Sequence, residues 1–82
     1  MIRLEVRNLQ QSRLAEYLVG EMAGHAEDDG SVRGAGWEVR FVPGEPALVG
    51  RFHVHVLFVE ITGPKAPAAA AFLRQKAMRG GG

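Results

Sequence analysis

The longest run of strand-forming residues in the chain, "ALVGRFHVHVLFVEI" from Ala47 to Ile61, changes the phase of its apolar pattern midway. On a regular strand, alternate side chains point to opposite faces, so Phe52 and Val54 would share the core face with Glu60. Burying a glutamate while exposing aliphatic side chains costs free energy on both faces of a sheet. The aliphatic residues that a regular strand would expose are Leu57, Val59 and Ile61.

Two hypotheses resolve this conflict. A β-bulge near Val56 or Leu57 would reverse the alternation, so that the later aliphatic residues point inward and Glu60 points outward. Alternatively, the strand stays regular and a second subunit covers its outer aliphatic end, because an apolar patch on an open sheet usually marks an interface. The second hypothesis predicts a homo-oligomer with Leu57, Val59 and Ile61 in the subunit interface.

Other segments of the chain show the periodicities of two further strands and two helices. Apolar and charged residues alternate over residues 2–7 and 37–42, which predicts half-buried strands. Helical spacing of apolar residues predicts a first helix of about four turns, with Asn8 as its N-cap and Gln11 completing a capping box. Gly20 and Gly24 weaken this helix and favour an early end. The alanine-rich segment 68–78 predicts a second helix, and residues 27–36 predict a mobile surface loop.

These elements predict one α+β domain over residues 1–79, followed by a flexible glycine tail at 80–82. The predicted architecture is a two-layer sandwich in the order β-α-β-β-α. Its three-stranded antiparallel sheet has the strand order 2-3-1, and both helices pack on one face. This element order resembles a truncated ferredoxin-like fold.

Composition narrows the classes of function. The 82 residues include no cysteine, so disulfides and thiolate zinc sites are absent, and the formal net charge is +1. The chain begins without the continuous apolar segment of a secretion signal, and no run is long enough to span a membrane. We therefore expect a cytoplasmic protein. Arginine greatly outnumbers lysine, which is compatible with a thermophilic source and with GC-rich coding.

Two histidines, His53 and His55, share one face of any extended strand. Together with Glu60 they have the His-x-His and Glu spacing that resembles the first motif of the cupins, a family in which these three residues bind a metal. The resemblance implies a zinc or iron site at His53, His55 and Glu60. Three strands cannot build the jelly-roll barrel of that family, which needs about eight. The alternative is two histidines on a solvated or interfacial sheet face, with no cofactor.

Four arginines, Arg3, Arg7, Arg40 and Arg51, lie on the predicted outer face of the sheet and form a candidate surface for anions or nucleic acid. Interspersed glutamates dilute the positive charge there, and the aromatic residues that could stack on bases belong to the predicted core. No serine or other nucleophile lies near a histidine and an acid in the sequence, so an enzymatic reaction has no specific signal.

The leading hypothesis is a small, noncatalytic, cytoplasmic protein that acts by self-association or by binding a partner through the face or edge of its sheet. A metal-binding protein and a weak nucleic-acid binder are the alternatives.

Overall fold

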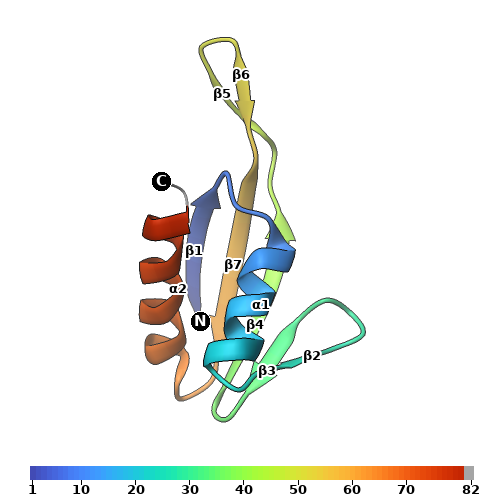
Figure 1. The fold of residues 1–82 in the computed structure, drawn as a ribbon, viewed down its shortest axis with the longest axis vertical. Helices are drawn as coiled ribbons and strands as arrows, with labels where there is room; N and C mark the ends of the chain where they lie inside the picture. Colours follow the sequence, from blue (N-terminus) through green and yellow to red (C-terminus); the bar gives the residue numbers. More distant parts are fainter. Residues whose placement is uncertain (81–82) are drawn as a thin grey trace.

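The computed structural model describes residues 1–80, with the side chains of residues 1–77, and shows an α+β fold. Two helices lie against one face of an antiparallel sheet in which the strand order is β1-β7-β4-β3-β2 (Figure 1). The strands are β1 (Ile2–Arg7), β2 (His25–Ala26), β3 (Val32–Gly34), β4 (Trp37–Pro43) and β7 (Val56–Thr62). The helices are α1 (Gln11–Glu21) and α2 (Ala66–Gly80).

Strand β7 is an interior strand of the sheet, because it pairs along its length with β1 on one side and β4 on the other. Val59, for example, lies opposite Leu4 of β1 and Phe41 of β4. The α+β class, the two helices and the antiparallel pairing are confirmed. The predicted order 2-3-1 is present as the β4-β7-β1 part of the sheet.

The prediction of only three strands is wrong, because the main sheet has five. The two additional strands, β2 and β3, lie in the region predicted to be a loop. β3 is held in place by Val32, which is fully buried and pairs with Val39. Gly34 of β3 lies opposite Trp37, and a β-carbon at Gly34 would collide with the indole ring. Elements of two and three residues are too short to show a periodicity.

Helix α1 begins and ends differently from the prediction. Its N-cap is Gln10, which makes no capping side-chain hydrogen bond, so the predicted capping box is wrong. Asn8 instead has a φ of 62° and turns the chain between β1 and the helix, a conformation that asparagine tolerates. The helix ends at Glu21, directly after Gly20, which agrees with the expected early end.

The long run from Ala47 to Ile61 contains three strands, and His55 separates the first two, which form a sheet of their own, from β7 of the main sheet. Strands β5 (Ala47–Val49) and β6 (Phe52–Val54) form a separate hairpin with Gly50 and Arg51 at its turn. We call this hairpin, residues 47–54, the arm. It projects beyond the two layers, as the upper end of the molecule in Figure 1 shows.

This division resolves the conflict in the apolar pattern without a bulge, because β7 pairs with β1 continuously from Val56 to Ile61. The orientation expected from the bulge hypothesis is nevertheless present, with the aliphatic residues facing the helices and Glu60 on the opposite face. Leu57, Val59 and Ile61 are at most 1% exposed, so the prediction that they form a subunit interface is corrected. The chain's own helices cover them, which removes the need for a partner there.

The core lies between the helices and the inner face of the sheet, where the predicted apolar stripes meet. Leu14 and Leu18 of α1 and Leu73 of α2 are fully buried there together with the aliphatic residues of β7. Lys76 of α2 forms an ion pair with Glu21 of α1 at 2.9 Å, which joins the two helices at the surface. Within residues 1–80, neither helix is long and apolar enough to span a lipid bilayer.

The substitutions Leu73→Ala and Leu48→Ala shorten a leucine side chain by the same amount, the first in the core and the second in the arm. Leu73 is fully buried, so its truncation should lower the free energy of unfolding by about 2–5 kcal/mol. Leu48 is 68% exposed, so its truncation should change that free energy by less than about 0.5 kcal/mol. Urea denaturation followed by circular dichroism measures both. Equal losses would contradict the assignment of the arm to a region outside the core.

Candidate functional site

The structure does not bring the three predicted metal ligands together. His53 lies in β6 of the arm, and His55 lies at the junction between the arm and the main sheet. Glu60 is on the outer face of β7, 3.9 Å from the guanidinium of Arg3. Among the residues that the structure describes, no group of three or more histidine, cysteine or acidic side chains is placed to hold a metal ion.

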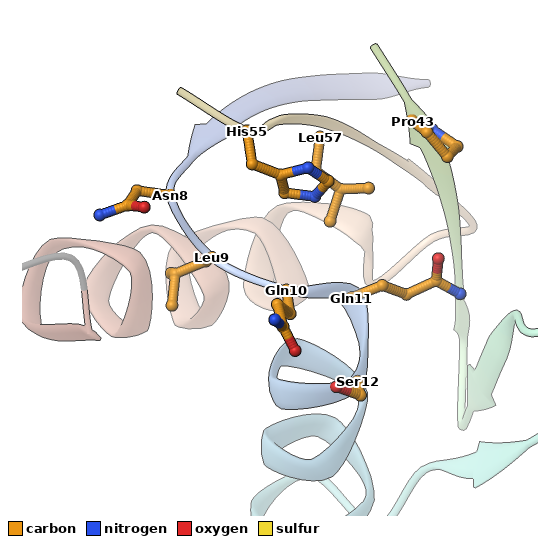
Figure 2. A pocket seen from close by; sticks show the side chains of 8 residues that line it. All are labelled: Asn8, Leu9, Gln10, Gln11, Ser12, Pro43, His55 and Leu57. Atoms are coloured by element: carbon orange, nitrogen blue, oxygen red, sulfur yellow. The ribbon is translucent and has the colours of Figure 1, made fainter. Parts of the chain in front are cut away.

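His55 lines a hollow of about 590 Å³ where the arm joins the body of the protein. Figure 2 shows its imidazole beside Leu57 and above Gln10, while the side chain of Asn8 is directed away. The backbone N–H of Asn8 donates a hydrogen bond to the carbonyl oxygen of His55 at 2.8 Å, which fixes the junction. Most of the lining residues are themselves exposed, so the hollow is a surface depression rather than an enclosed pocket.

Three of the four arginines of the predicted anion-binding face lie on the main sheet, and each has a glutamate close by. Arg3 lies near Glu60, and Arg7 donates a hydrogen bond to Glu5 at 2.7 Å. Arg40 lies 3.7 Å from Glu38, which also accepts hydrogen bonds from Arg33. These pairings reduce the positive charge of the outer face. The fourth arginine, Arg51, is separated from them at the turn of the arm.

A second set of polar contacts orders the connection between β2 and β3. Asp29 accepts hydrogen bonds from the hydroxyl of Ser31 at 2.6 Å and from its backbone N–H at 2.9 Å. The amide of Gln11 donates to the carbonyl of Gly30 at 3.3 Å and ties this turn to α1. The hydroxyl of Ser31, followed by its N–H, holds the pKa of the Asp29 carboxyl below its usual value. These contacts make the predicted mobile loop an ordered turn.

The arm carries three large hydrophobic residues that are exposed, Leu48, Val49 and Phe52. Its paired residues are Ala47 with Val54 and Val49 with Phe52. Because paired residues and alternate residues share a face, these four side chains form one wholly apolar surface, which we call the arm's apolar face. Val49 is 52% exposed and Phe52 75% exposed. Leu48, at 68% exposed, lies with His53 on the other face of the arm.

Sequence analysis missed this surface because it assigned Phe52 and Val54 to the core. A comparison between the length of the strand-forming run and the lengths of the two helices could have identified this exposed surface. The strand-forming run from Ala47 to Ile61 would extend roughly 50 Å as one strand. The 11-residue helix α1 is only about 16 Å long and the 15-residue α2 about 22 Å. Helices of this length cover about seven strand residues, so the remainder of the run has to leave the core.

Two oppositely charged residues lie at opposite ends of the arm. Glu45 lies at its base and Arg51 at its turn, and both are exposed. Gly50, beside Arg51, has a φ of 61°, which permits the tight two-residue turn. Among the ion pairs that the structure describes for residues 1–77, neither Glu45 nor Arg51 takes part. The arm therefore presents an apolar face with a negative base and a positive tip.

These features define a small α+β protein with two helices on one face of an antiparallel sheet and a projecting hairpin. The chain belongs to the archaeal MoaD-like family, whose model matches residues 2–82. This family fits a β-grasp fold. No curated protein sequence matches the chain. The glycine tail predicted for residues 80–82 extends past the described residues at positions 81 and 82, while Gly80 is the last residue of α2.

Ser31→Ala should raise the pKa of Asp29 towards its usual value, because it removes the hydroxyl that donates to the carboxylate. A lowered carboxyl pKa stabilises the native turn above the unfolded value near 3.8, and this contribution is lost as the pH falls through the native pKa. Loss of the hydroxyl should therefore reduce stability at neutral pH more than at pH 2. Carbon-detected NMR titration of the Asp29 carboxyl measures the shift.

Ser12→Ala is the matched control, because Ser12 is exposed on α1 and the hydrogen bonds described for the Asp29 carboxylate come from Ser31. Its Asp29 titration should coincide with that of the unmodified protein. An unchanged Asp29 pKa in Ser31→Ala would show that the hydroxyl does not stabilise the charged carboxylate.

Proposed function

We propose that this member of the archaeal MoaD-like family is a small, noncatalytic, cytoplasmic protein that acts by binding a protein surface through its arm. The observation that carries the proposal is the arm's apolar face, which projects clear of the two layers with Phe52 75% exposed. Exposed apolar surface of this kind, contiguous and held on a regular backbone, is typical of interaction sites.

The poor intrinsic stability of an isolated hairpin supports this proposal. A two-stranded hairpin without a covering layer is only marginally stable in water. The arm is three residues long on each strand and pairs with no other strand within the described residues. A partner that covers its apolar face would supply the missing layer and would bury side chains that now contact solvent.

The distribution of charge favours the arm, rather than the outer face of the main sheet, as the surface that binds a partner. On that face, arginines alternate with glutamates, and Arg3 also lies over the ring of Phe58 at 4.3 Å from its centroid. Burying such ion pairs in an interface costs free energy, because the charged groups lose their contacts with water, unless the partner supplies hydrogen bonds in their place. The arm carries no such network, so its association requires less desolvation of charge.

A photo-crosslinking residue at the arm tests this proposal directly. Phe52 is replaced by p-benzoylphenylalanine, and the purified variant is irradiated in an extract of the source cells. We expect discrete crosslinked products, identified by mass spectrometry as this chain or as another defined protein. The additional variant Val49→Asp should abolish these products, because a carboxylate in the arm's apolar face opposes its burial.

Val19 provides the control position, because it is an apolar residue of α1 that is 43% exposed and lies outside the arm. The same crosslinker at Val19 should give no discrete product. Equal products at both positions, or none at Phe52, would contradict docking through the arm.

A further inference from the structure

The arm's apolar face is graded in size from its tip to its base. The larger pair, Val49 and Phe52, lies beside the turn, and the smaller pair, Ala47 and Val54, lies towards the body. The tip pair is also the more exposed, since Ala47 and Val54 are partly buried. A partner surface that fits this face therefore needs small side chains opposite the tip and large ones opposite the base.

We infer that the partner is a second copy of this chain, whose arm packs antiparallel against the first about a two-fold axis. This inference rests on the proposed function of the arm. In an antiparallel pair, the tip of each arm lies over the base of the other, so Phe52 of each copy meets Ala47 and Val54 of its mate. A two-fold axis makes the same surface complementary to itself, as closed dimers require.

The charges at the two ends of the arm support the same arrangement. Glu45 is exposed at the base of the arm, two residues before β5 begins. Arg51 lies at the tip. Antiparallel packing brings Arg51 of each copy next to Glu45 of the other, which forms two symmetric ion pairs. Parallel packing would instead place like charges together, so the sequence of the arm selects the antiparallel dimer.

The area of the arm sets the strength of this association. Four apolar side chains cover much less than the roughly 800 Å² per partner of a standard stable interface. We therefore expect a dimer that dissociates on dilution rather than a permanent one. His53 projects from the opposite face of the arm, with Leu48, and stays outside the contact.

Charge reversal tests both the dimer and its orientation. Glu45→Arg places arginine opposite Arg51, and Arg51→Glu places glutamate opposite Glu45, so each variant alone has two repulsive contacts. Each should weaken dimerisation by about 10-fold, the effect of roughly 1.4 kcal/mol. An equimolar mixture of the two variants restores both ion pairs, so it should form a heterodimer with the affinity of the unmodified protein. Sedimentation equilibrium over a range of concentrations measures all four samples.

Both substitutions lie at exposed positions, and circular dichroism with thermal unfolding verifies that each variant is folded. Phe52→Ser, at a position 75% exposed, serves as a further variant that should dimerise at least 10-fold more weakly while keeping its fold. A monomer at millimolar concentration, unchanged dimerisation in the charge variants, or a mixture that remains monomeric would overturn the inference.

The two proposals fail in different ways. If the purified protein is monomeric but the crosslinker at Phe52 captures a different protein, docking through the arm stands and self-association is wrong. If Phe52 yields no discrete product in the extract and the purified protein is monomeric, both are wrong. A crosslink to a second copy, together with rescue in the mixed variants, supports both.

Discussion

The match in length between the helices and strand β7 determines the rest of this structure. Helix α2 has 15 residues and spans about 22 Å, which is close to the length of the seven-residue strand β7. Over that distance, Leu57, Val59 and Ile61 lie under the helices and are fully or almost fully buried. Beyond His55 no helix covers the hairpin, so the same kind of residue becomes exposed. One strand-forming run thus supplies both the core and the arm.

Much of the fold could be predicted because its main elements are long enough to show a period. Alternation in residues 2–7 and 37–42 identified β1 and β4, and the order β4-β7-β1 followed from antiparallel pairing. The helical stripes were also right, since Leu18 and Leu73 are fully buried. Strands β2 and β3 could not be recognised, because Val32 is the only buried apolar residue in β3 and a single such residue shows no period.

The candidate site was harder to predict than the fold, because its residues continue a regular strand pattern. Phe52 and Val54 alternate with histidines just as core residues would, and nothing local marks the end of the covering layer. His53 and His55 share a face on any regular strand. In the structure, however, His53 lies in the arm, whereas Glu60 lies on the outer face of β7 and pairs with Arg3. A spacing motif therefore suggested a metal site, whereas the position of the helices determined which side chains face solvent.

The central claim is that the protected core ends at His55 and that no further layer of the described chain supports the arm. Amide hydrogen exchange in dilute protein tests this most directly. The amides of Val59 and Ile61 should exchange only through global unfolding, whereas those of the β5–β6 hairpin should exchange orders of magnitude faster through local opening. Equal protection from Phe52 to Ile61 would show one continuous, fully supported strand and would contradict the account.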